Sequence, residues 1–310
     1  MTDNEPPELP RGIALAWGVA ANPQRGPKRE MSVEKIVEAA VELADAEGLG
    51  AVSMAAVAAK LGFTPMSLYR YVTAKDDLLL LMQEEATGIP PEDHREAEGW
   101  LERLRALFEA QVRVYLRHPW ILSLPITGSP ITPNSSAWLD AALASLEPTP
   151  LTAEERLAVA LAVTGHARWY GMVLAGYAEQ GRSSGLSPEE VTAMEASLFD
   201  RVITVDEFPA LRRAIDEGVF LSAADPFRFG VDRVLDGVES YIAGLERGEP
   251  HVSRQEWVVV DPAELSGDKR LREAQKAVRE AEKALRDARR NERQALRDAR
   301  ERVAKAQKPS

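Results

Sequence analysis

The chain has 310 residues, of which 45% are hydrophobic and 28% are charged, and these values are typical of a folded globular protein. The absence of cysteine excludes disulfide bonds, a thiolate nucleophile and a cysteine-ligated zinc site. The formal net charge of −11, taken as an average, argues against a nucleic-acid partner.

The charges are distributed unevenly along the chain. Residues 268–310 carry 15 Lys and Arg against 8 Asp and Glu, a net charge of +7. Residues 76–267 carry 15 basic against 32 acidic side chains, a net of −17, whereas residues 25–75, with 7 against 6, are close to neutral. Because binding depends on the local surface and not on the average, the net charge does not exclude DNA.

The N-terminal segment contains a leader and a short basic arm. Residues 1–24 are rich in proline and small residues, so we expect a flexible leader, with docking of Trp17 as the alternative. Arg25, Lys28 and Arg29 form a basic arm that a Gly-Pro pair keeps from being helical. The start lacks the features of a signal peptide, and we find no stretch of about 20 apolar residues, so we expect a cytoplasmic protein without a membrane partner.

Four helices are expected between residues 32 and 88, because apolar residues recur there every three or four positions between capping signals. Serine and threonine are favoured N-caps, and glycine ends helices. The third helix is expected to be short, from Pro65 to about Val72, with proline at a position where a missing N–H costs nothing. The start and end signals are, in chain order, Ser32, Gly48, Ser53, Gly62, Thr64, Lys75 and Gly88.

The rest of the chain is also expected to be helical, which makes the fold class all-α. Only residues 257–260 have the composition of a strand, and no glycine-rich phosphate-binding loop is present. The candidate helices before the tail cover residues 95–118, 135–146, 153–179, 188–199, 208–218 and 226–247.

The basic tail has a heptad period. Leu271, Val278 and Leu285 are seven residues apart, with an alanine three residues beyond each. The next such pair comes eleven residues later, at Leu296 and Ala299, so the heptads contain one insertion of four residues. We expect a charged helical tail over residues 268–310. A solvated helix, a DNA-contacting arm and a thin self-associating coil all remain open as its role.

The segment from Ser53 to Val72 is the most informative part of the sequence, because two short helices around Gly62 form a candidate helix-turn-helix. In such a unit the second helix enters the major groove of DNA and presents its outward side chains to bases and phosphates. The alternative is an ordinary hairpin of an all-α protein. The outward side chains are expected to be Met66, Ser67, Tyr69, Arg70 and Tyr71, and the inward ones Ala58, Leu61 and Leu68.

The run from Leu61 to Val72, LGFTPMSLYRYV, followed by Lys75 and Leu78, resembles the signature of the tetracycline-repressor (TetR) family of bacterial transcription regulators. The resemblance covers about residues 25–85. It implies an all-α protein with an N-terminal helix-turn-helix DNA-binding domain and a larger helical domain that binds a ligand and dimerises.

The resemblance also implies which residues meet operator DNA. Base edges or nearby phosphates would be contacted from the second helix, and phosphates from the flanking helix starts and the basic arm. Some relatives place an arginine near the start of the first of these two helices, where this chain has Ala55 and Ala56, so direct base readout is expected to be sparse. The candidate DNA-binding residues are Arg25, Lys28, Arg29, Ser53, Thr64, Pro65, Met66, Ser67, Tyr69, Arg70, Tyr71 and Lys75.

The acidic middle of the chain contains many large rings for a helical domain, and such rings often line an apolar cavity for a bulky or aromatic ligand. Core packing is the alternative for each ring. The four histidines have no metal-ligand spacing, so we expect no metal and no cofactor. The candidate ligand-binding residues are Phe108, Trp120, Trp138, His166, Trp169 and Tyr170.

Two main function classes follow, and a DNA-coating or architectural protein that acts through the basic tail is a third. The first is a homodimeric, ligand-responsive transcriptional regulator, most simply a repressor, that dimerises through the helices over residues 153–179 and 226–247. The second is a helical small-molecule-binding protein or enzyme whose hairpin is incidental, although no nucleophile–base pair supports catalysis. The expected domains are a leader (1–24), a DNA-binding domain (25–88), a ligand-binding and dimerisation domain (89–250), a linker (251–267) and the tail (268–310).

Overall fold

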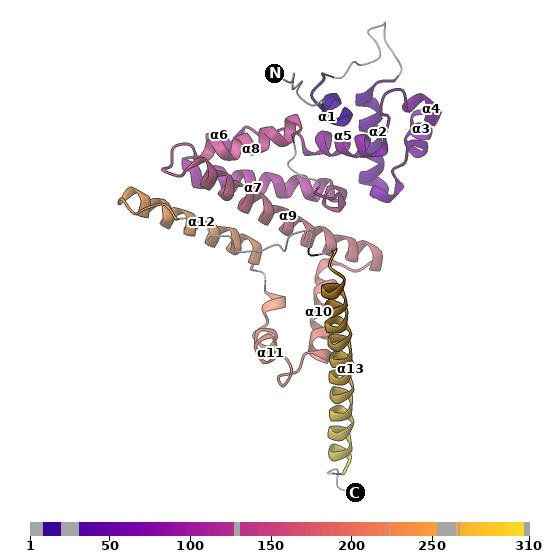
Figure 1. Cartoon of the computed structure of the whole chain (residues 1–310), viewed down its shortest axis with the longest axis vertical. Coiled ribbons are helices and arrows are strands. Elements are labelled where there is room, and N and C mark those ends of the chain that lie inside the picture. The colour runs from indigo at the N-terminus through magenta and orange to yellow at the C-terminus, as the bar shows by residue number, and fades with distance from the viewer. Residues whose placement is uncertain are drawn as a thin grey trace. The chain divides into compact units, whose positions relative to one another are not determined.

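The computed structural model describes residues 9–19, 31–126, 131–222, 224–252, 265 and 267–306, and within these ranges every regular element is a helix (Figure 1). The all-α expectation is therefore confirmed. The basic arm at Arg25, Lys28 and Arg29 and the strand-like residues 257–260 lie outside the described residues. The chain forms two compact units, Met1–Pro250 and His251–Ser310, which we describe separately.

The N-terminal part of the first unit contains five α-helices and one 3-10 turn. They are α1 (Arg11–Ala16), α2 (Val33–Glu47), η1 (Leu49–Ala51), α3 (Met54–Leu61), α4 (Pro65–Leu68) and α5 (Lys75–Thr87). Ser32 and Ser53 are the N-caps of α2 and α3, and their hydroxyls accept hydrogen bonds from the N–H groups of Lys35 and Ala56.

The remainder of the first unit, which we call the body, is built from longer helices. They are α6 (Asp93–Glu96), α7 (Gly99–Arg117), η2 (Pro119–Ser123), α8 (Pro133–Leu146), α9 (Ala153–Ser184), α10 (Pro188–Val202), α11 (Pro209–Asp216), η3 (Val219–Leu221) and α12 (Pro226–Glu246). Thr152 and Ser187 form capping boxes with Glu155 and Glu190, which fixes the starts of α9 and α10. The second unit contains α13 (Lys269–Ala306).

Two hydrophobic cores hold the first unit together. The first lies among α2, α3, α4 and α5, and the fully buried Ile36, Leu68 and Leu78 belong to it. The second lies among α7, α8, α9 and α12, around Leu104 and Leu235. Because η2 contributes buried side chains to the first core, that core is joined to the body by packing as well as by chain connectivity.

Three expectations differ from the structure. The leader is not uniformly flexible, because residues 11–16 form α1 and pack on α5, and the Trp17 indole donates a hydrogen bond to the carbonyl of Ile131 (2.6 Å). The third helix ends at Leu68 and continues only as a turn to Val72. The hydrogen bond of Trp17 matches the alternative of docking through this residue, and Leu15 and Ala16 of α1 are partly buried against the first core.

The third difference concerns α9. By length and composition this helix is apolar enough to cross a bilayer, although we expected no such stretch. Ala160, Val163, Ala167 and Gly171 are buried in the body, which accounts for part of the apolar composition. The rest lies on an exposed face of α9 that includes Leu161 and is described below.

Candidate DNA-binding surface and effector cavity

The turn between α3 and α4 is set by Gly62. Its φ of +75° lies in the left-handed region, which glycine adopts without a steric penalty. Its N–H donates to the carbonyl of Ala59 (3.1 Å), and the N–H of Phe63 donates to the carbonyl of Ala58 (2.9 Å). These bonds close the end of α3 and direct the chain into α4. The expected helix-turn-helix geometry is therefore present.

The short helix α4 presents polar and apolar side chains to solvent. Leu68 is completely buried, whereas Met66 is 73% exposed and Tyr69 is 41% exposed. Pro65 and Arg70 are also exposed. Because only one side is buried, the outer face of α4 and the following turn are free to enter a groove of DNA.

Hydroxyl groups hold the rest of this surface in place. Ser67 is half-buried, and its Oγ lies 3.0 Å from Oγ1 of Thr64. The ring of Tyr71 is half-buried against the first core, so its position is fixed by packing. We define the recognition surface as Ser53, Thr64, Pro65, Met66, Ser67, Tyr69, Arg70, Tyr71 and Lys75.

The start of α5 adds a site suited to a phosphate. Its N-cap is Ala74, which has no side chain to accept hydrogen bonds from the first N–H groups of the helix. Lys75, the first residue of α5, is exposed beside these N–H groups. Backbone donors, the helix dipole and an ammonium group favour an anion at this point, and the carboxylates of Asp76 and Asp77 in the same turn oppose it.

A cavity of about 300 Å³ lies among α7, α9 and the start of α12. One side is apolar and the other is formed by charged side chains. Its lining residues are Arg105, Phe108, Glu109, Val112, Arg113, Tyr170, Asp225, Arg228, Val231 and Asp232. The volume lies at the small end of the range for small-molecule sites.

Four of the six candidate ligand-binding residues gather beside this cavity. Tyr170 stacks on Phe227 with ring centroids 4.6 Å apart, and Trp169 meets the same ring edge-on at 4.8 Å. Phe108 lies 5.8 Å from His166, ring centroid to ring centroid. His166 Nε2 donates to the carbonyl of Phe227 (2.7 Å), so this histidine ties α9 to α12.

The other two candidates, Trp120 and Trp138, lie elsewhere in the first unit. Both are buried, and each indole N–H has a partner on the DNA-binding side. Trp120 donates to Oδ1 of Asp45 in α2 (2.7 Å), and Trp138 donates to the carbonyl of Gly88 at the end of α5 (2.9 Å). The structure therefore does not bring them to the cavity.

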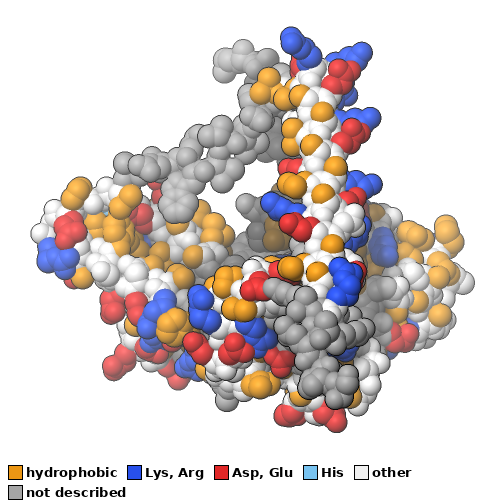
Figure 2. Space-filling model, turned by 90° about the horizontal axis from the view of Figure 1, so that it is seen from below, with side chains coloured by type: hydrophobic (Ala, Val, Ile, Leu, Met, Phe, Trp, Pro, Cys, Tyr) orange, Lys and Arg blue, Asp and Glu red, His pale blue; other side chains and the backbone are white. Residues whose placement is uncertain are grey.

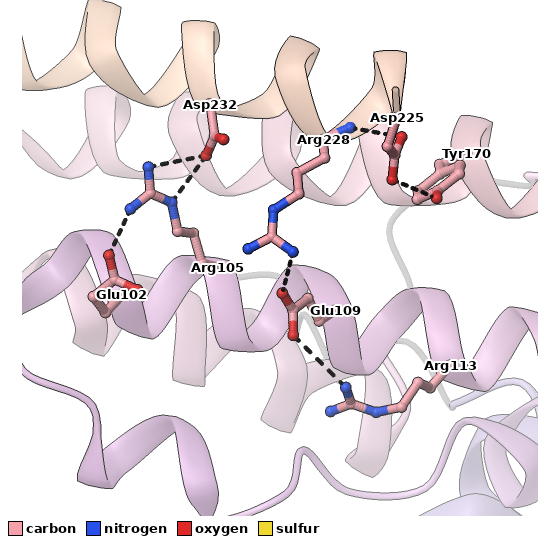
Figure 3. A network of polar contacts seen from close by, with 8 residues as sticks. All are labelled: Glu102, Arg105, Glu109, Arg113, Tyr170, Asp225, Arg228 and Asp232. Carbon is pink, nitrogen blue, oxygen red and sulfur yellow. Dashed lines mark hydrogen bonds and ion pairs between the residues drawn. The ribbon is translucent and has the colours of Figure 1, made fainter. Parts of the chain in front are cut away.

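Charged side chains connect α7 to α12 along the cavity, as Figure 3 shows. Arg105 donates to Oδ1 of Asp232 from Nε (3.0 Å), and its Nη2 lies 2.9 Å from the same oxygen. Arg228 Nη1 lies 3.7 Å from Glu109 Oε1, and Arg113 Nη1 lies 3.9 Å from Glu109 Oε2. The pairs of Glu109 are thus looser than that of Asp232.

Tyr170 and Asp225 form a hydrogen-bonded pair at the edge of the cavity. The Tyr170 hydroxyl donates to Oδ2 of Asp225 (2.7 Å). Burial, together with this hydrogen bond, raises the pKa of Tyr170 to about 12. Burial opposes ionisation of Asp225, but hydrogen bonds from Tyr170 and from the N–H groups of Arg228 and Phe227 outweigh it and lower the pKa of Asp225.

The sequence predicted most of the rings but not the polar part of the cavity. Arg105, Arg228 and Asp232 were not among the candidate residues, because charged residues at helical spacing look like a solvated face, and the ring of Phe227 was not among them either. The pair Asp225-Pro226 was identified only as a helix start. Among the described residues, no group of three or more His, Asp or Glu side chains is placed to hold a metal ion.

A helix-turn-helix on a helical body that contains a cavity defines a DNA-binding regulator of the helix-turn-helix class. Residues 36–82 match the sequence profile described as bacterial regulatory proteins, tetR family. Residues 91–242 match the profile described as tetracyclin repressor-like, C-terminal domain. The chain belongs to the TetR family.

Individual relatives agree with this assignment. The HTH-type transcriptional repressor DrrR1 of Streptomyces coeruleorubidus is 32% identical over 244 residues, which cover 78% of this chain and 89% of that protein. The HTH-type transcriptional repressor Rv1353c of Mycobacterium tuberculosis is 26% identical over 223 residues, which cover 69% and 82%. The structure of ActR from Streptomyces coelicolor in complex with actinorhodin is 24% identical, with a TM-score of 0.55 over 74% of this chain and 100% of that one, and it shares the fold.

Proposed function

We propose that this protein is a homodimeric repressor that leaves its operator when a small aromatic molecule binds the body. The exposed face of α4, set by the Gly62 turn and held by a buried Leu68, is the observation that carries the proposal. The name of DrrR1, a repressor, supports repression as the regulatory outcome. This surface and the family assignment favour a cytoplasmic regulator over the alternative of an enzyme.

The recognition surface, together with Arg25, Lys28 and Arg29, is proposed to bind double-stranded operator DNA. Met66, Tyr69 and Arg70 would meet base edges, while Lys75 and the start of α5 would hold a phosphate. Residues 25–88 thus form the DNA-binding domain and residues 89–250 the effector and dimerisation domain, with a linker over 251–267.

Dimerisation is proposed to involve α9 and α12. Several apolar side chains on these two helices are exposed in the single chain, which is costly for a monomer in water. Val231 and Leu235 of α12 are instead buried within the chain, so they are not available for this interface. The exposed set comprises Leu157, Leu161, Trp169, Met172 and Tyr177 on α9, and Phe229 and Val234 on α12.

The effector is proposed to be an aromatic molecule with an acidic group. Phe108, Tyr170 and Val112 would cover its ring, and its anionic oxygen would attract Arg228 and Arg113 away from Glu109, because those pairs are long. That ActR was solved with actinorhodin supports an aromatic effector. A cavity of about 300 Å³ favours one or two rings unless α12 moves outward.

Binding to DNA from the region upstream of the protein's own gene tests the proposal. We expect fluorescence anisotropy to detect a complex whose affinity falls steeply between about 50 and 200 mM salt. Lys75→Ala should weaken binding and lower the salt slope by about 1. Lys60→Ala is the matched control, since Lys60 lies on α3 and pairs with Glu42 (3.0 Å). No binding by the unaltered chain at low salt would sink the proposal.

A further inference from the structure

The second unit contains a long helix with an uncovered apolar face. In α13, Val278 is 57% exposed, Leu285 51% and Leu296 49%. Figure 2 shows hydrophobic side chains along one side of this helix and charged side chains along the other. The helix α13 lies outside both parts of the chain that match the family, residues 36–82 and 91–242. Its function is therefore not set by the family assignment.

The spacing of the apolar residues keeps them on one face over the length of the helix. From Leu271 to Leu296 there are 25 residues, which at seven turns corresponds to 3.57 residues per turn. This value lies between the 3.5 of a left-handed coiled coil and the 3.6 of a straight helix. Leu271 to Ala288 lie within the uninterrupted heptads, at 3.5 residues per turn, so a partner helix in a left-handed coiled coil can follow this segment of the face, and Leu296 lies beyond it.

We propose that α13 pairs, in antiparallel orientation, with α13 of a second copy of this chain. The sequence repeats a four-residue pattern of Leu or Val, Arg, an acidic residue and Ala, beginning at residues 271, 278 and 285. When a second copy runs in the opposite direction, each large residue of the pattern lies opposite an alanine. The three layers, each formed twice by symmetry, are Leu271 with Ala288, Ala274 with Leu285, and Val278 with Ala281.

Uniform layers are the reason for the antiparallel orientation. In a parallel pair in register, leucine would face leucine and alanine would face alanine. Wide and narrow layers would then alternate along the seam, the line of contact between the two helices. Antiparallel pairing puts one large and one small residue in every layer, which allows close and even packing. It also makes the two helix dipoles run in opposite directions over the paired segment.

The residues beside the seam fit the same register. On one side, Ala277 lies beside Ala284 of the second copy, which widens the apolar contact. On the other side, Asp268, which caps α13 by accepting from the N–H of Leu271 (2.7 Å), lies beside Arg289 of the second copy. The register therefore places opposite charges at both ends of the paired segment and no like-charge pair between them.

The net positive charge of the tail is weak evidence for DNA binding, because the basic residues are not gathered on one face. Some basic residues of the helix have acidic partners one turn away, as in the pairs Lys276–Glu280 (3.8 Å) and Arg290–Asp287 (2.7 Å). These pairs lie outside the apolar face, and they interrupt the basic surface, whereas a DNA-binding arm needs a concentrated basic face.

Disulfide trapping tests the pairing, because the chain has no cysteine and every introduced thiol is the only one in its chain. Full-length Leu271→Cys and Ala288→Cys chains are produced together with tags of different size and oxidised mildly. We expect the mixed product to exceed either same-variant product at least tenfold. Identical positions would be about 25 Å apart, since 17 residues at 1.5 Å separate them along the axis.

A matched pair on the opposite face controls for chance encounters. Lys276→Cys and Lys283→Cys lie at the same level of the proposed register but point away from the seam, so no mixed disulfide is expected. Adding Leu285→Asp to the first pair should abolish the mixed product, whereas Lys283→Asp should leave it unchanged.

An excess of same-variant disulfide would indicate parallel helices and would overturn the proposal. Absence of any disulfide between Leu271→Cys and Ala288→Cys would also overturn it, because it would indicate an unpaired helix or a DNA-binding arm. Anisotropy with operator DNA on the same samples reports the DNA-binding function independently, so a failure of tail pairing is distinguishable from a failure of the proposed function.

Discussion

The single residue Asp225 has further roles besides the helix start that the sequence indicates. Its side chain accepts hydrogen bonds from the N–H groups of Phe227 (2.9 Å) and Arg228 (3.0 Å) and so caps α12. It also accepts the hydroxyl of Tyr170 on α9 and lines the cavity. One carboxylate thus links the start of α12 to α9 at the place where an effector would bind.

Removing the two partners of this pair separately distinguishes its roles. Asp225→Ala should lower the free energy of unfolding by about 1–2 kcal/mol, because it removes an N-cap. Tyr170→Phe should cost about 1 kcal/mol, because only one hydrogen bond is lost. Denaturant unfolding of both variants and of the double variant measures these costs. Strict additivity in the double variant would contradict a direct interaction between the two side chains.

The pH dependence of stability follows from the raised pKa of Tyr170. The folded state favours the neutral phenol, so its contribution is fully present below the unfolded pKa of about 10 and is lost as the pH rises toward 12. We expect the stability difference between the unaltered chain and Tyr170→Phe to shrink between pH 9.5 and 12, pH values chosen to span this titration. The pKa of Asp225 is lowered, so its carboxylate stabilises the folded state fully at pH values above the ordinary pKa of an aspartate. This stabilisation is lost as the pH falls through the lowered pKa.

At the scale of an element, α9 depends on glycine for its packing against α7. A Cβ atom built on Gly171 would lie 2.8 Å from Cβ of Tyr115, which is too close for two carbons. Gly176, on the same helix, has no atom within 4 Å of such a Cβ. The two positions therefore differ only in whether a neighbouring helix approaches.

Substituting alanine at both positions gives opposite expectations. Gly171→Ala should lower the free energy of unfolding by about 1–3 kcal/mol, because α9 must move from α7. Gly176→Ala should raise it by up to about 1 kcal/mol, because alanine favours a helix over glycine. Thermal or denaturant unfolding measures both, and equal effects at the two positions would contradict the close contact.

The exposed apolar face of α9 makes a second prediction for this element. Leu161→Glu should convert a dimer to a monomer, because a charge would be buried in the proposed interface. Light scattering after size-exclusion chromatography measures the mass. To avoid association through α13, the measurement is made on chains that also carry Leu285→Asp. Ser183→Glu, which adds the same charge to an exposed site near the end of α9, should leave the mass unchanged.

At the scale of the first unit, two groups of hydrogen bonds connect the body to the DNA-binding helices. Asp45 of α2 accepts the indole N–H of Trp120, and His118 Nδ1 lies 2.8 Å from the same oxygen. On the other side, Trp138 donates to the carbonyl of Gly88. Both groups lie at helix ends next to the body, where a shift of α7 or α8 would reach α2 and α5.

Removing the hydrogen bonds of Asp45 should weaken the coupling between effector binding and operator binding, and should leave effector binding itself nearly unchanged. If effector binding at α7 is transmitted through η2, Asp45→Ala should reduce the factor by which effector weakens operator affinity, commonly 5–150-fold for allosteric proteins. Effector affinity in the absence of DNA should change less than twofold. Titrations of operator with and without effector measure the coupling, and an unaltered factor would place the transmission elsewhere.

The sequence by itself determined the helical fold class, the helix-turn-helix and most helix starts, because these depend on local signals: N-cap hydroxyls, the glycine of a left-handed turn and the three-to-four-residue apolar period. The residues of the proposed recognition surface were assigned by the resemblance to the TetR family over one continuous stretch of the chain, and their contacts with DNA stay a prediction. The heptads of the tail are also visible there.

Only the tertiary structure decided which rings share a cavity. Phe108 and Tyr170, which line the cavity, and Phe227, which stacks on Tyr170 beside it, come from three helices far apart in the chain. Trp120 and Trp138 have the same composition signal but lie elsewhere, bonded to Asp45 and Gly88. Helix packing sets these distances, and packing depends on contacts between residues that no local pattern relates. For the same reason the ion pairs between α7 and α12 were hidden among charges at ordinary helical spacing.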